Sequence, residues 1–82
     1  MRFMVTMLFH TDDPAAMAAL IPQERAHVQE LTEQGTVHGL YLATDGSRGW
    51  MVMQGESEED INRLLATFPL RPYMQVEIVP LR

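Results

Sequence analysis

One carboxylate of this sequence stands where acid–base chemistry could be performed. Leu20, Glu24, Val28 and Leu31 follow one another at intervals of 4, 4 and 3 residues, which places them on one face of a helix. If Glu24 points between that helix and a sheet, its removal from water raises the pKa of the carboxyl group and suits it to move protons near neutral pH. The spacing supports equally well a solvated glutamate at the edge of the apolar stripe, paired with His27 at i+3.

A histidine on a predicted strand is the second candidate. His38 falls on the strand face that we expect to meet the helices, where it could act as an acid–base or carboxylate-binding partner of Glu24. The alternative is a hydrogen-bonded core histidine, which is the commoner role of a single histidine among aliphatic residues. His10 ranks below His38, because a hydrogen bond that stabilises a turn accounts for it.

Four further residues are candidates for contact with a small-molecule substrate: Tyr41, Arg48, Trp50 and Tyr73. Tyr41 and Trp50 lie opposite one another in a predicted hairpin. Such a pair can stack on a ligand, but it can also stabilise the hairpin by itself as a cross-strand aromatic pair.

Other kinds of site find little support. The three histidines show no metal-ligand spacing and the chain has no cysteine, so we expect no metal. The sequence also lacks a glycine-rich phosphate loop, a nucleophile elbow and a CxxC pair, so the stronger signatures of an enzyme are missing.

The elements that would position these residues follow from hydrophobic periodicity and turn residues. A short apolar run predicts a buried strand, Pro14 after an aspartate predicts a helix start, and Asp45-Gly46 predicts a type I′ hairpin turn. Pro22 predicts a kink in the first helix, or a short turn before a main helix. The expected strands are 3–9, 36–43, 48–54 and 73–79, and the expected helices are 14–35 and 57–68.

The order β-α-β-β-α-β predicts an α+β, ferredoxin-like sandwich, an antiparallel four-stranded sheet with two helices on one face. However, the first strand is apolar on both sides, and Trp50 and Val52 alternate with Met51 and Met53 along the third. A sheet covered on one side only should alternate apolar and polar residues. We therefore expect a second copy of the chain to cover the other face, as a homodimer or higher homo-oligomer.

Composition limits the remaining possibilities. A chain of 82 residues has room for one domain, spanning 1–82. Its net charge of -5 would repel a phosphate backbone, so nucleic acid is not an expected partner. No apolar run is long enough to span a bilayer and no signal peptide is recognisable, so we expect no membrane and a cytoplasmic protein.

Two stretches resemble the muconolactone delta-isomerase family. They are Gly35-Thr36 and the segment from Phe68 to Ile78, which is similar to that family's Pro-Leu-x-Pro-Tyr-Met-x-(Ile/Val)-Glu-Val pattern. The similarity in length and element order covers nearly the whole chain, and Glu24 aligns with a glutamate on the family's first helix. The resemblance implies a dimeric α/β barrel and an isomerase of aromatic catabolism that needs no cofactor.

Under this resemblance Glu24 is the proton shuttle for a double-bond shift in an unsaturated lactone, with His38 as its partner. The family's second strand is rich in arginine and tryptophan, whereas this chain has Val37, His38, Tyr41 and Leu42 there, so that only His38 could carry positive charge. Two alternatives stay open: a cofactor-free monooxygenase or cyclase acting on an aromatic polyketide-like substrate, and a dimer that binds a small molecule without catalysis.

Overall fold

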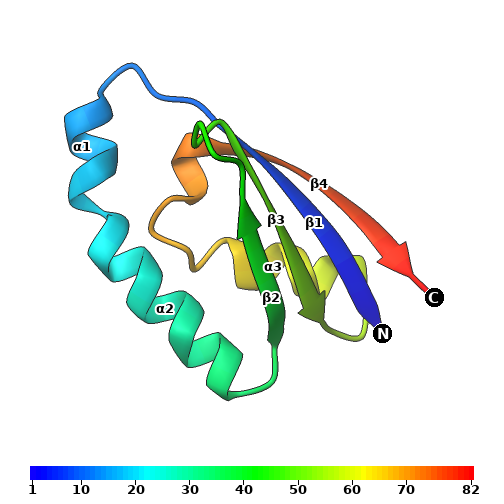
Figure 1. The fold of residues 1–82 in the computed structure, drawn as a ribbon. Helices are drawn as coiled ribbons and strands as arrows, with labels where there is room; N and C mark the ends of the chain where they lie inside the picture. Colours follow the sequence, from blue (N-terminus) through cyan, green and yellow to red (C-terminus); the bar gives the residue numbers. More distant parts are fainter.

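The chain folds into a layer of helices packed on one face of a four-stranded antiparallel sheet (Figure 1). The computed structural model describes residues 1–82. The strands run in the order β2-β3-β1-β4, which confirms the ferredoxin-like α+β fold. The strands are β1 (Arg2–Phe9), β2 (Val37–Leu42), β3 (Arg48–Gln54) and β4 (Met74–Leu81), and the helices are α1 (Pro14–Ala19), α2 (Ile21–Glu33), α3 (Glu58–Leu65) and the 3₁₀ turn η1 (Arg71–Tyr73).

The first helical segment is divided in two, so the layer contains three α-helices where the sequence predicted two. Asp13 caps α1 by accepting a hydrogen bond from the N–H of Ala16 at 3.0 Å. The chain then breaks at Leu20, and α2 starts with Pro22 in its first turn. Proline has no N–H with which to continue the hydrogen bonds of α1, so it is tolerated only where a new helix begins. Of the two predicted outcomes at Pro22, the short turn before a main helix is the one observed.

Helix α2 ends where the sequence predicts, at a left-handed glycine. Gly35 has φ +81, and its N–H donates to the carbonyl of Thr32 at 3.1 Å. The next N–H, that of Thr36, reaches back to the carbonyl of Leu31 at 2.9 Å. These two bonds form a Schellman motif, which satisfies the last carbonyls of the helix and turns the chain into β2.

The hairpin between β2 and β3 keeps the predicted pairing of Tyr41 with Trp50, but its turn is different. A type I′ turn at Asp45-Gly46 needs a positive φ at both residues. Only Gly46 has one (φ +74), and the turn is closed by its N–H donating to the carbonyl of Ala43 at 2.9 Å. The predicted type I′ turn is therefore wrong, because the closing hydrogen bond spans residues 43–46 and the left-handed Gly46 is the last residue of that turn, not one of its two central residues.

A bulge in β2 changes the position of His38. Val37 pairs with Met53 and Gly39 pairs with Val52, so one residue of β2 is left over between them. The bulge puts Val37 into the core, where it is 2% exposed, and leaves His38 exposed. The predicted pairing of His38 with Met53 on the helix-covered face is thus wrong, because a bulge reverses which side chains face the core.

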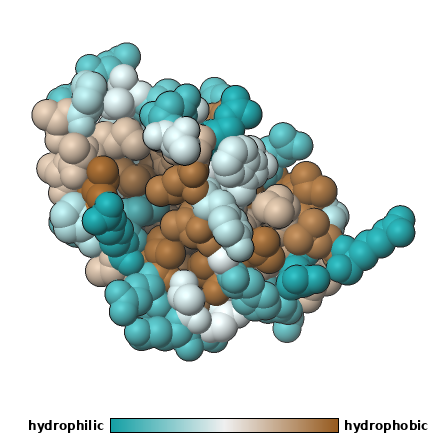
Figure 2. All heavy atoms as spheres, viewed as in Figure 1, coloured by the Kyte–Doolittle hydropathy of each residue, from teal (hydrophilic) through white to brown (hydrophobic).

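The two faces of the sheet differ in their cover. The helix-covered face carries the buried side chains of β1 and β3, including Val5, Met51 and Met53, which are fully buried against Ile61 and Leu65 of α3. The opposite face, here called the outer face, carries Met4, Thr6, Trp50 and Val52, which are half-buried, together with exposed residues such as Tyr41. Figure 2 shows hydrophobic side chains gathered over the strands and along the gap between α2 and β2.

The last strand starts one residue later than predicted. Tyr73 belongs to η1, the turn that follows α3, and β4 runs from Met74 to Leu81. Its inward side chains alternate as predicted, with Met74, Val76 and Ile78 packed against the core. Pro80 is tolerated near the end of this strand because β4 is at the edge of the sheet.

Candidate functional site

A cavity of about 390 Å³ lies between the helices and the sheet, next to the edge strand β2. Its walls come from α1, α2, the hairpin, the inner face of the sheet and the segment that follows α3. Ten of its fourteen lining residues are hydrophobic, and the polar side chains among the others are Glu24, Arg25 and Gln29, all on α2. A mostly apolar cavity with a few converging polar groups is the usual form of a small-molecule site.

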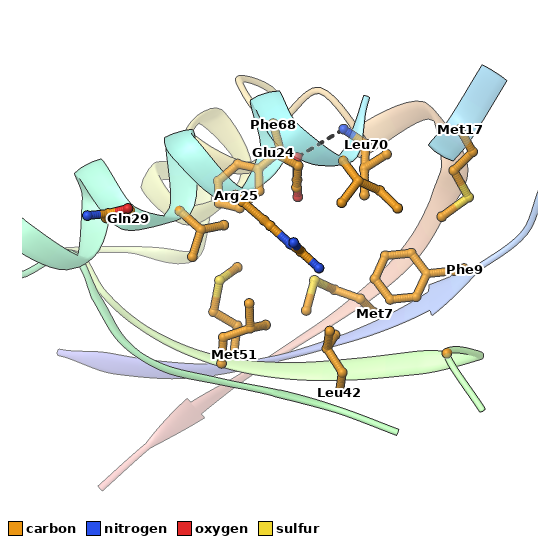
Figure 3. Close-up of a pocket in the computed structure, with 14 residues that line it drawn as sticks. Met7, Phe9, Met17, Glu24, Arg25, Gln29, Leu42, Met51, Phe68 and Leu70 are labelled. Atoms are coloured by element: carbon orange, nitrogen blue, oxygen red, sulfur yellow. Dashed lines mark hydrogen bonds between the residues drawn. The ribbon is translucent and has the colours of Figure 1, made fainter. Parts of the chain in front are cut away.

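Glu24 enters this cavity from α2 with its carboxylate held by the backbone (Figure 3). Oε1 of Glu24 accepts a hydrogen bond from the N–H of Leu70 at 3.1 Å. Burial raises the pKa of Glu24, while the Leu70 N–H and the positive charge of His27 lower it to a smaller extent. The net effect is a carboxyl group with a raised pKa in an apolar cavity, which are the properties of a general base for work near neutral pH.

Arg25, the next residue of α2, also reaches toward the cavity, and the sequence analysis missed it. Figure 3 shows its side chain extending from α2 into the space between Glu24 and Met7. The one ion pair of this structure joins Arg63 to Asp60 on α3. No carboxylate therefore forms a salt bridge with Arg25, and its charge is unpaired. Arg25 lies outside the apolar stripe of α2, and its long side chain reaches the cavity from the rim.

His27 connects α2 to the segment that carries Leu70. Its Nε2 lies 2.7 Å from Oγ1 of Thr67, and its ring packs edge-on against Phe68 at 5.0 Å between centroids. The Thr67 hydroxyl donates a hydrogen bond to the carbonyl of Leu64 at 2.6 Å, so its oxygen must accept the hydrogen bond from the Nε2–H of His27. Glu24 and His27 therefore both hold the Thr67–Leu70 segment against α2.

The structure does not bring His38 to Glu24. Nε2 of His38 is hydrogen-bonded to the carbonyl of Gly35 at 2.9 Å, at the start of β2, and His38 does not line the cavity. Of the two alternatives that the sequence left for this residue, neither a core position nor a partnership with Glu24 is observed. The geometry assigns it to the junction between α2 and β2.

The four predicted substrate contacts also lie outside the cavity. Tyr41, Arg48 and Trp50 point to the outer face of the sheet, and Tyr73 lies in η1, partly buried against the core. Tyr41 is 67% exposed, so a ligand in the cavity would not touch it. The strand residues that do line the cavity are their inward-facing neighbours, such as Leu40, Leu42 and Met51.

No cluster of three or more histidine, aspartate or glutamate side chains is arranged to hold a metal ion. None of the helices combines the length and the apolar character needed to cross a membrane.

Comparison with known proteins identifies similar sequences along most of the chain. The family model described as muconolactone delta-isomerase matches residues 1–82. The muconolactone delta-isomerase of Cupriavidus pinatubonensis (strain JMP 134 / LMG 1197) is 32% identical over 71 residues, which cover 85% of this chain and 77% of that protein. The muconolactone delta-isomerase of Rhodococcus opacus is 30% identical over 69 residues, 84% of this chain and 74% of its own.

Two solved structures are similar in fold to this chain. A crystal structure of muconolactone isomerase superposes with a TM-score of 0.81 at 31% identity, covering 99% of this chain and 88% of that one. The 5-chloro-2-hydroxyhydroquinone dehydrochlorinase of Burkholderia phenoliruptrix AC1100, solved with 2,5-dihydroxybenzoquinone, superposes with a TM-score of 0.71. The two chains are 13% identical, with coverage of 100% of this chain and 94% of that one, so this second similarity concerns the fold alone.

Proposed function

Because the chain belongs to the muconolactone delta-isomerase family, we propose that it shifts a carbon–carbon double bond in a small unsaturated lactone, with Glu24 as the proton shuttle. The observation that carries this proposal is the position of Glu24, half-buried in an apolar cavity with one carboxylate oxygen fixed by the Leu70 N–H. A double-bond shift needs a group that removes a proton from one carbon and returns it to another. One well-placed carboxylate can do both.

The chemistry of the step suits a desolvated carboxylate. With Oε1 held by Leu70, Oε2 of Glu24 is the oxygen available to a ligand. It would remove a proton from the carbon beside the double bond, the electron pair of that C–H bond would form the new double bond, and the old double bond would open toward the lactone carbonyl. Return of the same proton to the carbon next to that carbonyl completes the shift. A carboxyl group with a raised pKa is a stronger base for the first step than one in water.

Arg25 supplies the group that would orient the substrate. Muconolactone, the substrate named for the relatives, is a lactone with a carboxylate arm, and the unpaired guanidinium at the rim of the cavity matches a carboxylate in charge and geometry. In this proposal Arg25 takes the place that the sequence analysis gave to His38. The carboxylate arm would lie against Arg25 at the rim, with the lactone ring beside Glu24.

The outer face of the sheet supports a homodimer as the working form. Val52, Met4 and Val79 form one apolar row across three strands, and Tyr41 and Trp50 pair in the next row. No helix covers these side chains, and the side chain of Val79 is accordingly 43% exposed. A second copy with the same sheet is the partner we propose, since a two-fold axis pairs identical apolar surfaces. Tyr41, Arg48 and Trp50 would then be interface residues.

A turnover assay tests the proposed function directly. The purified protein is incubated with muconolactone, and the ultraviolet spectrum is followed for the isomeric enol-lactone while an oxygen electrode records oxygen. We expect formation of the enol-lactone without oxygen uptake. Oxygen consumption with polyphenolic substrates and no reaction with the lactone would instead support the monooxygenase alternative. A folded protein that changes neither class of compound would overturn the proposal.

A further inference from the structure

The polar groups of the cavity are confined to one wall. Glu24, Arg25 and Gln29 all belong to α2, whereas α1, the sheet and the segment after α3 contribute hydrophobic side chains. In Figure 3, Gln29 lies on one side of Glu24 and Arg25, and Met17 and Phe9 lie on the opposite side, beyond Leu70. The end of the cavity formed by Met17 and Phe9 therefore offers a ligand only apolar contacts.

This apolar end exceeds what a small lactone acid can use. The cavity of about 390 Å³ falls within the range of roughly 300–1,000 Å³ that encloses drug-sized ligands. A lactone ring beside Glu24 and a carboxylate at Arg25 would engage the polar wall and leave the surfaces of Met17, Phe9 and Leu42 without a partner. Leu42 is 61% exposed although it lines the cavity, so its apolar surface is available to a ligand.

The side chains at this end are suited to substituents of varied shape. Two of the lining methionines, Met7 and Met17, lie toward this end (Figure 3), and their flexible side chains adapt to irregular apolar partners. The guanidinium of Arg25 is the charged group nearest to that end (Figure 3), so an apolar group bound beyond it, against Met17 and Phe9, would displace water from apolar surface.

We propose that the preferred substrate is an unsaturated lactone acid that carries, besides its carboxylate, an apolar substituent of several carbons lying between Met17, Phe9 and Leu42. This inference rests on the proposed isomerase function, because Glu24 and Arg25 orient the rest of the molecule. It adds that the site selects against the unsubstituted lactone. The selectivity comes from the hydrophobic surface that the substituent removes from water.

Substrate selectivity provides the test. We would measure kcat/KM for muconolactone and for muconolactones with methyl, ethyl, propyl and butyl groups on the ring. Transfer of each methylene into the apolar end should raise kcat/KM about fourfold until the cavity is full. Values that stay level or fall along the series would overturn this inference and leave the proposed function in place. Absence of turnover for every member, muconolactone included, would overturn the proposed function itself.

A matched pair of variants locates the effect in the cavity. Met17→Trp fills the apolar end, so the ratio of kcat/KM for the butyl compound to that for muconolactone should fall at least tenfold, while Ala18→Trp on the exposed side of α1 should preserve it. An unchanged ratio in a folded Met17→Trp variant would contradict the proposed location. If that variant does not fold, the wild-type series decides the question alone.

Discussion

The N–H of Leu70 donates a hydrogen bond to Oε1 of Glu24 at 3.1 Å, and so joins residues 46 positions apart. The contact links α2, which carries the one carboxylate of the cavity, to the segment between α3 and β4. It fixes one oxygen of Glu24 and leaves the other available to a ligand. The site therefore depends on how α2 and the Thr67–Leu70 segment pack together.

Replacement of Glu24 by Gln should change how stability depends on pH. Burial raises the pKa of Glu24 above its ordinary value in the folded protein, so the folded state binds this proton more tightly than the unfolded state does. Stability is then lost as the pH rises from the unfolded pKa through the folded one, because ionised Glu24 must stay partly buried. Glutamine can still accept the Leu70 hydrogen bond and does not ionise.

Urea unfolding of both proteins between pH 3.5 and 7.5, values that bracket the ordinary glutamate pKa of about 4.3, provides the measurement. Relative to the wild type, Glu24→Gln should gain stability as the pH rises, and the two should converge at the acidic end. Curves that remain parallel throughout would contradict a raised pKa at Glu24.

Replacement of Arg25 by Met should weaken substrate binding more than it slows the chemical step. A hydrogen bond to a charged group contributes about 1.5–3 kcal/mol, so KM for muconolactone should increase by about 10- to 150-fold. The methyl ester of the same lactone, which lacks the negative charge, should show almost no difference between wild type and variant. Arg63→Met removes an arginine that pairs with Asp60 on α3 and should have no effect on KM. Equal effects on the acid and the ester would argue against Arg25 as the carboxylate anchor.

Replacement of His27 by Gln should shift the pH profile of activity. Protonated His27 lowers the pKa of Glu24 through its positive charge. Loss of this charge should raise the pKa of Glu24, so the acidic limb of kcat/KM against pH should move to higher pH. Thr67→Val removes the hydrogen bond of His27 but not the charge, and it should leave the position of that limb nearly unchanged. A limb that does not move in His27→Gln would show that the histidine has only a structural role.

Replacement of Met4 by Glu should dissociate the proposed dimer. Met4 lies at the centre of the outer face between Val52 and Val79, and a carboxylate there would be buried without a partner in a sheet-to-sheet interface. Light scattering should give the mass of a dimer for the wild type and of a monomer for the variant. Glu59→Lys on the exposed side of α3 is the control and should remain dimeric. A wild-type protein that is monomeric at micromolar concentration would contradict the proposed interface.

Much of the fold could be predicted because local patterns and tertiary structure agree. The cap at Asp13, the glycine at position 35 and the alternation along β4 all act within a few residues, and each is found in the structure. The bulge in β2 could not be predicted, since the two-residue alternation of a strand contains no mark of a single extra residue. That one residue moved His38 away from the helices.

The site was only partly predictable for a similar reason. The apolar stripe of α2 pointed to Glu24, because burial of a helix face follows from spacing. Arg25 lies off that stripe, and only the three-dimensional path of its long side chain takes it to the cavity. The Leu70 N–H is a backbone group from a distant segment, so no pattern of side chains could have indicated it.

The central claim is that Glu24 carries the proton, and the most direct measurement compares two glutamates of α2, one inside the cavity and one outside it. The rate of muconolactone isomerisation would be measured for the wild type, for Glu24→Gln and for Glu30→Gln, whose side chain is exposed and outside the cavity. General acid–base catalysis contributes about 10²- to 10⁴-fold, so Glu24→Gln should lose that factor in kcat while Glu30→Gln keeps the wild-type rate. A folded Glu24→Gln variant that isomerises the lactone as fast as the wild type would contradict the account.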